Sequence, residues 1–114
     1  MLNRLLQDGL VVFVKRACPT CAMIEPQMCE AAAARADFQV VTQDRADFPA
    51  GVANRVHDRE LDHSWLNNIE ATPTLIRFAG GREAERVMGW DRAAWQRLTG
   101  MGHIGAQLPP LQPG

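Results

Sequence analysis

Residues 10–21 read LVVFVKRACPTC, an apolar run followed closely by two cysteines. The unbroken aliphatic and aromatic run at 10–14 predicts a strand that is buried on both faces. Pro19 suits the first position of a helix, because its ring fixes φ and its missing N–H would have no partner there. The stretch therefore predicts a buried strand, a short loop, and a helix that starts at Cys18 and carries Cys21 one turn later.

The segments on both sides of this stretch continue the pattern. We expect an alanine-rich helix over 19–36 with a kink at Pro26, and a second strand over 38–42. Strand, helix and strand in that order form a right-handed βαβ unit with two parallel strands. Ahead of the unit, residues 2–8 predict a short helix that ends at Gly9.

The middle of the chain is less regular. Residues 44–57 predict an irregular loop with at most one helical turn. Asp58 is placed to cap a helix over 59–68, and we expect Trp65 to anchor that helix on the core.

A hairpin and a last helix complete the predicted elements. Two strands, at 74–79 and 83–88, are joined by the Gly-Gly turn signal at 80–81. Asp91 caps a final helix that continues to about residue 98.

This order of elements predicts an α/β protein with a central four-stranded sheet and helices on both faces. The predicted domain covers residues 1–102. Residues 103–114 lack periodicity and are rich in Gly and Pro, which predicts a loose tail.

Length and composition are those of one ordinary globular domain. The chain has 114 residues, 46% of them hydrophobic, and a formal net charge of −1. This charge argues against a broad surface for nucleic acid or for an anionic membrane. No stretch approaches the length of a membrane span or of a signal-peptide core. We therefore expect a cytoplasmic protein, and a monomer.

The two closely spaced cysteines suit redox chemistry. At the start of a helix, the unpaired N–H groups and the helix dipole favour the thiolate, so the pKa of Cys18 is expected below the ordinary value of about 8.5. Cys21 lies one turn on, with Cβ atoms about 5–6 Å apart, which is close enough for a disulfide. We therefore expect Cys18 to attack a disulfide and Cys21 to resolve the mixed disulfide.

Four features in the same order resemble the thioredoxin family over roughly residues 2–99. They are the C-x-x-C after the central strand, Pro26 five residues after the second cysteine, Thr72-Pro73-Thr74 before a strand, and Gly89 after the return strand. The resemblance implies a thioredoxin fold, in which Thr72-Pro73 forms a cis-proline loop beside the dithiol.

The resemblance also implies a function and a set of site residues. The implied activity is that of a thiol–disulfide oxidoreductase, which reduces or exchanges disulfides in partner proteins and is recharged by an upstream reductant. Cys18 and Cys21 would carry the catalysis, without a metal or an organic cofactor. The residues implied to bind substrate are Thr72, Pro73, Ala17 and Pro19.

Three features depart from the family pattern. Ala17 stands where a tryptophan is usual, and Pro19-Thr20 replaces the usual Gly-Pro. Val12 stands where the family has a buried aspartate that relays the proton of the resolving cysteine, so we expect slower reduction than in an ordinary thioredoxin. Glu25, one turn beyond the second cysteine, is an alternative relay, although a solvated helix charge is its simpler interpretation.

Two other functions fit the same residues. One is a thioredoxin-fold module that binds proteins at the Pro73 groove without turnover. The other is a thiolate carrier of copper(I) or zinc. Turnover that depends on Cys18 distinguishes the oxidoreductase from both.

The remaining polar and sulfur-bearing residues have simpler interpretations. Cys29 is three helical turns from Cys18, roughly 16 Å, and is expected to be a small packed residue. A polar cluster without a cysteine fits the start of a helix better than a zinc site, and its members are His57, Asp58, Asp62 and His63.

Overall fold

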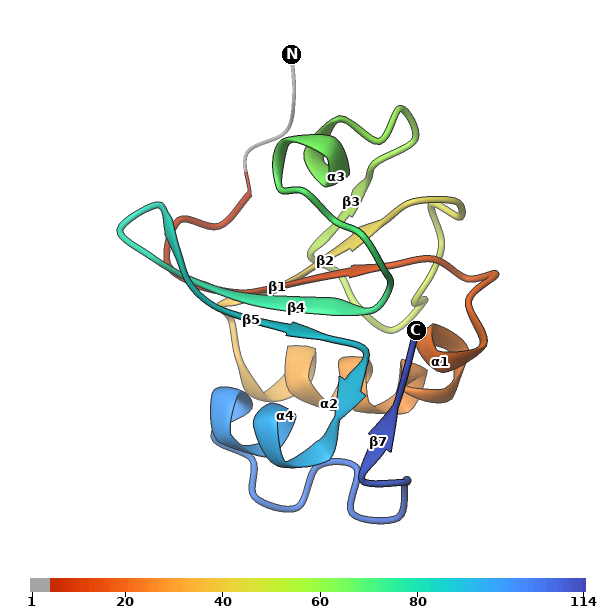
Figure 1. The fold of residues 1–114 in the computed structure, drawn as a ribbon, viewed down its shortest axis with the longest axis vertical. Coiled ribbons are helices and arrows are strands. Elements are labelled where there is room, and N and C mark those ends of the chain that lie inside the picture. The colour runs from red at the N-terminus through yellow and green to blue at the C-terminus, as the bar shows by residue number, and fades with distance from the viewer. Residues whose placement is uncertain (1–4) are drawn as a thin grey trace.

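The computed structural model describes residues 5–114 and places β1 (Gly9–Val14) in the middle of a five-stranded sheet. The strand order is β3-β2-β1-β4-β5 (Figure 1). β1 pairs in parallel with β2 (Phe38–Thr42) and antiparallel with β4 (Thr74–Ala79), so the sheet is mixed. The α/β architecture predicted from the sequence is confirmed.

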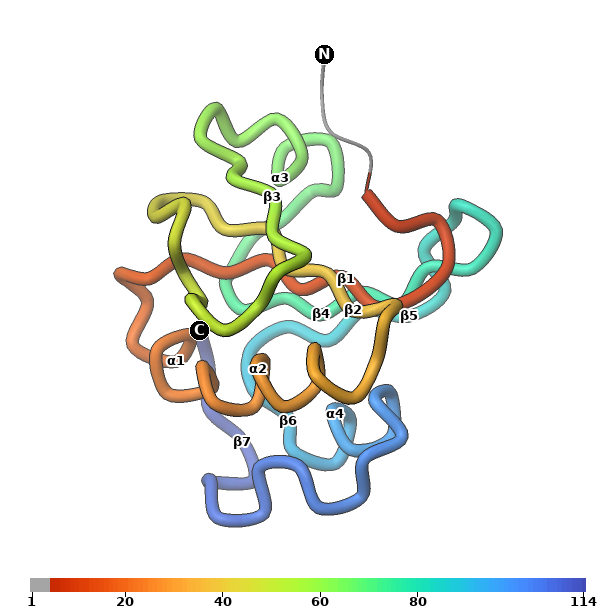
Figure 2. The backbone as a smooth tube through the Cα atoms, turned by 180° about the vertical axis from the view of Figure 1, so that it is seen from behind, coloured from red at the N-terminus to blue at the C-terminus, as the bar shows by residue number. Residues whose placement is uncertain are grey.

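Helices cover both faces of this sheet, as predicted. Leu10, Val12 and Val14 point toward one face. There they pack in a core with residues of three helices, α1 (Pro19–Met23), α2 (Glu25–Ala34) and α4 (Arg92–Thr99). Val11 and Phe13 point to the other face and join a smaller cluster, which includes Ile69 just beyond α3. All five side chains are fully buried, because alternate residues of a central strand face opposite layers. Figures 1 and 2 show α1, α2 and α4 on one side of the sheet and α3 on the other.

The helix predicted over 19–36 is two helices, α1 (Pro19–Met23) and α2 (Glu25–Ala34), which meet at Ile24. Pro26 is the cause, because its ring clashes with the carbonyl four residues earlier and its nitrogen donates no hydrogen bond. The break therefore lies two residues before the proline. It leaves α1 as a short separate helix that carries both cysteines.

The prediction of four strands is corrected to five. β3 (Arg55–His57) lies within the segment predicted as a loop and pairs in parallel with β2. Only Val56 of its three residues is buried, so the strand has too short an apolar pattern to be recognised from the sequence.

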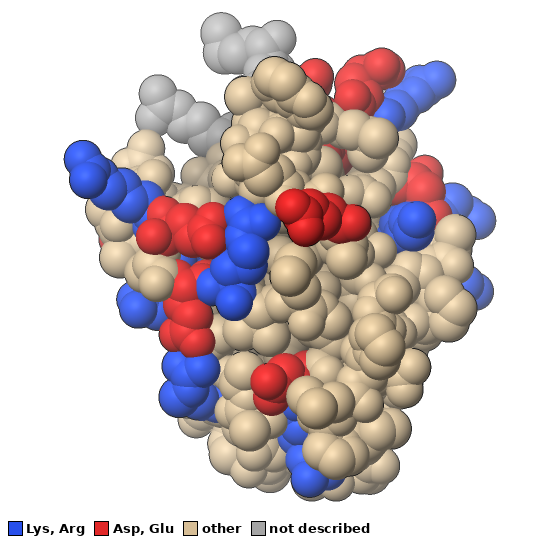
Figure 3. Space-filling view, in the orientation of Figure 1, with Lys and Arg blue, Asp and Glu red and all other residues tan. Residues whose placement is uncertain are grey.

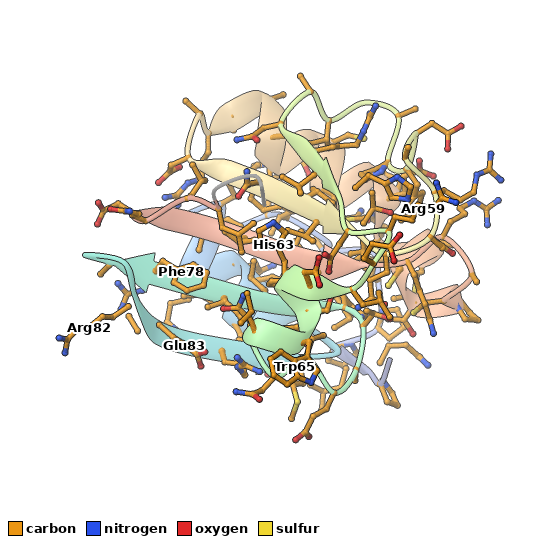
Figure 4. All side chains as sticks on the ribbon, turned by 90° about the horizontal axis from the view of Figure 1, so that it is seen from above. Arg59, His63, Trp65, Phe78, Arg82 and Glu83 are labelled. Carbon is orange, nitrogen blue, oxygen red and sulfur yellow. The ribbon has the colours of Figure 1, made fainter. Side chains whose placement is uncertain are left out.

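The helix predicted over 59–68 is shorter than expected, and α3 spans Asp62–Leu66. Asp58 does cap it, since its carboxylate accepts hydrogen bonds from the N–H groups of His63 and Ser64, at 3.0 and 2.9 Å. The prediction that Trp65 anchors the helix on the core is wrong. Its side chain lies on the outer side of α3 and is 78% exposed (Figure 4).

The hairpin and the last helix follow the prediction closely. β4 is joined to β5 (Arg82–Met88) by a turn in which both glycines have positive φ. Asp91 is the N-cap of α4 (Arg92–Thr99), and its carboxylate accepts from the N–H of Ala94 at 3.1 Å. β3 and β5 form the two edges of the sheet.

The prediction of a loose tail at 103–114 is wrong. Ile104 is fully buried, and β7 (Leu111–Gln112) pairs antiparallel with β6 (Trp90–Asp91). The Trp90 indole N–H also donates to the carbonyl of Pro109 at 2.8 Å. Backbone groups make most of these contacts, so the apolar pattern of the sequence does not predict them.

At the other end, the helix predicted over 2–8 lies partly outside the described residues, and residues 5–8 form no helix. They run along the sheet instead, where the Leu6 N–H donates to the Gln39 side chain at 3.0 Å. Among the described residues, no helix has both the length and the apolar character needed to cross a bilayer.

Candidate functional site

Cys18 is the N-cap of α1, as the sequence predicts. Its backbone is extended, and its sulfur accepts a hydrogen bond from the N–H of Cys21 at 3.3 Å. Pro19 occupies the first turn of the helix. The sulfur therefore lies where the first turn presents unpaired N–H groups and the positive end of the helix dipole.

The loop before Cys18 is held by a residue that the sequence analysis missed. The Asp44 carboxylate accepts from the N–H groups of Arg16 and Ala17, at 2.7 and 3.0 Å. β1 and β2 are parallel, so their carboxyl ends meet at one edge of the sheet and bring Asp44 to this loop. An acid two residues after the second predicted strand was the available signal.

Thr72 contacts the first cysteine of the dithiol. The Cys18 thiol donates to the Thr72 carbonyl at 3.3 Å. The Thr72–Pro73 bond is cis, and the Pro73 carbonyl accepts from the N–H of Gly89 at 2.7 Å. The loop predicted to contact substrate thus lies directly beside the first cysteine.

The two thiols have very different acidities. Burial raises the pKa of Cys18, but hydrogen bonds from the side chain and N–H of Cys21 outweigh it, so this pKa lies below its ordinary value. The Thr72 side chain and the Thr20 N–H lower it further. Burial, together with the hydrogen bond to Cys18, raises the pKa of Cys21 to about 12. Cys18 is therefore the more acidic of the two thiols, and Cys21 keeps its proton at neutral pH.

A cavity of about 370 Å³ opens beside Cys18. The residues predicted to contact substrate line it, except Pro73, which is buried. Cys21 is fully buried and does not line it. The lining residues are Lys15, Ala17, Cys18, Pro19, Glu70, Ala71, Thr72 and Gly114. A reagent in this cavity meets Cys18 first.

The end of the chain also reaches this site, which no sequence signal indicated. The Thr20 hydroxyl, between the two cysteines, donates to the Pro113 carbonyl at 2.6 Å. Gly114 lines the cavity beside Cys18 and lies against the Thr72 carbonyl. Figures 1 and 2 both show this segment beside α1.

Three other sequence candidates lie on β1 and α2. Val12 is fully buried in the same core cluster as Cys21. Glu25 begins α2 and is half-buried. Cys29 packs against the core, as predicted, and a Cβ at Gly51 would come within 2.7 Å of its sulfur.

Asp58 and His63 are buried at the start of α3, where the Asp58 carboxylate also accepts from the Ser64 hydroxyl at 2.6 Å. In the part of the chain that the structure describes, no three His, Cys, Asp or Glu side chains gather as a metal ion would need.

Comparison with known proteins places the fold. No family model matches the chain, and no curated protein matches it either. Among solved structures, MTB DsbF superposes with a TM-score of 0.67 at 18% identity, covering 84% of this chain and 81% of that one. A secreted Mycobacterium tuberculosis disulfide oxidoreductase homologous to E. coli DsbE gives 0.59 at 15%, covering 73% and 70%.

Mitochondrial thioredoxin 3 from Saccharomyces cerevisiae, in its oxidized form, superposes with a TM-score of 0.57 at 18% identity. The match covers 80% of this chain and 74% of that one. Likeness at such identities concerns the fold. Together with the mixed sheet and its two helical layers, it shows that this chain has the thioredoxin fold.

Proposed function

We propose that this protein is a thiol–disulfide oxidoreductase that reduces or exchanges disulfides in partner proteins. The observation that carries the proposal is the pair of thiols in α1. Cys18 has a lowered pKa and faces the cavity, whereas the pKa of buried Cys21 is raised to about 12. One thiol is thereby ready to attack, and the other is held in reserve.

In the first step, the Cys18 thiolate attacks one sulfur of a substrate disulfide. A Cys18–substrate disulfide forms, the substrate S–S bond breaks, and the departing substrate thiolate takes a proton from water. The lowered pKa of Cys18 favours this step, because the thiolate is the attacking species.

In the second step, Cys21 gives its proton to water and its sulfur attacks the Cys18 sulfur, from which the second substrate sulfur departs as a thiolate and takes up a proton. The Cys18–Cys21 disulfide forms and the second substrate thiol leaves, so two electrons have passed from the protein to its substrate. An external dithiol reductant returns the protein to the reduced state by the reverse exchange.

The second step is where this protein is expected to be slow. A pKa of about 12 means that very little Cys21 is ionised at neutral pH, and Val12 supplies no carboxylate to take its proton. Glu25 is half-buried at the start of α2 and is the remaining candidate for that role. Slow resolution suits a restricted set of partners better than general protein reduction.

Substrate is proposed to bind as an extended segment along the Thr72–Pro73 loop. The Thr72 backbone would pair with it as with one more strand, and Ala17 and Pro19 would line the wall next to Cys18. Around α1 and β7 the visible surface is mostly uncharged, while charges gather over the β4–β5 hairpin (Figure 3). This distribution supports a polypeptide partner rather than a nucleic acid.

The proposed setting is the cytoplasm, where a dithiol stays reduced and an odd number of cysteines is no hazard. The proposed working form is a monomer, because one chain supplies both thiols and the Thr72 loop.

Insulin reduction by dithiothreitol tests the proposal. The protein should accelerate insulin precipitation, Cys18→Ser should remove the effect, and Cys29→Ser, as the matched control, should retain it. Failure of the unaltered dithiol to turn over insulin or any other protein disulfide would contradict the proposal and favour the binding module.

A further inference from the structure

The last six residues form a strap that crosses the candidate site. The strap, residues 109–114, is anchored at its start by the Trp90 indole and by the Arg92 N–H, which donates to the Pro110 carbonyl at 3.0 Å. β7 then pairs with β6, and the far end reaches Thr20 and Thr72. The strap therefore spans from α4 to the dithiol.

The far end of the strap, Gln112 to Gly114, lies between α1 and Gly89. On one side, Thr20 in α1 donates to the Pro113 carbonyl. On the other side lies Gly89, where an added Cβ would come within 3.0 Å of the Gln112 carbonyl oxygen. Gly114 continues into contact with the Thr72 carbonyl, the group that accepts from the Cys18 thiol.

This position coincides with the one that the proposed function gives to substrate. A substrate strand would need the Thr72 backbone and the space between α1 and Gly89, and Gln112 to Gly114 already fill both. Two extended segments cannot pair with the same backbone groups at once.

The strap is held by contacts that can be released without unfolding the core. All six of its residues are exposed, and Leu111, its largest apolar side chain, is 66% exposed. Its attachments are mainly hydrogen bonds of its backbone. Segments with few buried apolar contacts open most readily.

We infer that the strap is an intramolecular occupant of the substrate groove, which restricts access of large partners to Cys18 until it is displaced. The inference rests on the proposed function for its meaning, since the groove is the one proposed to hold substrate. The cavity beside Cys18 remains open while the strap is in place, and Cys18 itself is 4% exposed. We therefore expect small disulfides and alkylating reagents to react with the sulfur far more readily than a protein does.

Two variants dislodge the strap in different ways. Gly114→Val places a side chain where the Thr72 carbonyl oxygen lies and pushes the far end outward. Deletion of residues 111–114 removes β7 and the far end but keeps the contacts of Pro109 and Pro110. Gly102→Ala is the matched control, because nothing lies within 4 Å of a Cβ added there.

The first measurement is the alkylation rate of Cys18 by a polyethylene-glycol maleimide, divided by the rate with iodoacetamide. This ratio measures how far a large reagent is excluded from the Cys18 sulfur, and it does not depend on redox activity. The second is the rate of the first exchange step with insulin, compared with a small aromatic disulfide. The apparent reactivity of an occluded site is proportional to the fraction of molecules in which the site is open. Both strap variants increase that fraction and should therefore raise the two ratios roughly fivefold. Gly102→Ala should leave them unchanged.

The outcomes separate this inference from the proposed function. Unchanged ratios in both strap variants, in a protein that does exchange disulfides, would overturn the strap inference and leave the proposed function standing. Raised alkylation ratios without exchange in any variant would support occlusion by the strap and contradict the proposed function.

Discussion

Two helices of this protein begin with the same geometry and differ in the atom that caps them. In α4 the Asp91 carboxylate accepts from the N–H three residues on, at 3.1 Å. In α1 the Cys18 sulfur accepts from the N–H three residues on, at 3.3 Å. Both cap residues have extended backbones.

The difference shows how one local device serves two purposes. A carboxylate at an N-cap stabilises the helix and has no further chemistry to perform. A thiol at the same place shares the helix N–H groups, and they stabilise its anion, which is the nucleophile. The cap of α1 also faces a cavity, whereas Asp91 is held between α4 and the β6–β7 pair.

The largest effect is expected from a variant that keeps the helix cap at position 18 and removes the nucleophilic sulfur. Serine is as good a cap as aspartate, so Cys18→Ser should keep α1 and the melting temperature close to those of the unaltered protein. Disulfide exchange should fall to the uncatalysed rate, because the hydroxyl is not ionised. Circular dichroism and the insulin assay measure the two effects. Loss of the fold together with the activity would show that serine cannot replace the Cys18 sulfur as the cap of α1.

The next largest effect is the selectivity of alkylation. The pKa of Cys18 is lowered and that of Cys21 is raised to about 12, so the fraction of thiolate at pH 7 favours Cys18 by more than about a hundredfold. Iodoacetamide should label Cys18 first, with a half-maximal rate at a pH below the ordinary thiol pKa. Peptide mapping over pH 5 to 9 measures this. Earlier labelling of Cys29 would show that the helix start does not activate the sulfur.

A smaller effect is expected when an acid is placed behind α1. Val12→Asp puts a carboxyl in the core cluster that contains Cys21, where it can accept the resolving proton. Resolution of a pre-formed Cys18 mixed disulfide should become several-fold faster, while stability falls on the order of 3 kcal/mol because the carboxyl is buried. Val12→Asn is the matched control, since it is polar but cannot take the proton. Equal resolution rates for the two variants would exclude proton relay.

The smallest effect tests the purely structural cap. Asp91→Ala should lower the free energy of unfolding by about 1 kcal/mol, because one N–H of α4 loses its acceptor. Asp91→Asn should restore most of it. Urea denaturation measures the loss, and the insulin assay should show no change in either variant. A slower assay in Asp91→Ala would mean that this region acts on the dithiol after all.

The central part of the fold was predictable because its signals are local. The run at 10–14, the Gly-Gly turn and the cap at Asp91 each follow from a few neighbouring residues, and the structure has all three as predicted. β3 and the strap were missed for one common reason. Backbone pairing with distant segments holds them, and their side chains leave little apolar pattern.

The site was predictable to a similar extent. Cys18 and Cys21 are separated by one helical turn, so their geometry was local, and the family resemblance supplied the Thr72–Pro73 loop. Asp44 and Pro113 reach the site through chain separations of 27 and 93 residues. Such contacts depend on the complete topology, which periodicity along the chain does not encode.

The two edges of the sheet also determine how this protein behaves when it is concentrated. Open strand edges can pair with another copy and seed aggregation. Here β3 is only three residues long, and four of the seven residues of β5 are charged, namely Arg82, Glu83, Glu85 and Arg86. Both edges of the sheet therefore resist growth into fibres, even though the proposed function requires a strand-binding surface beside the dithiol.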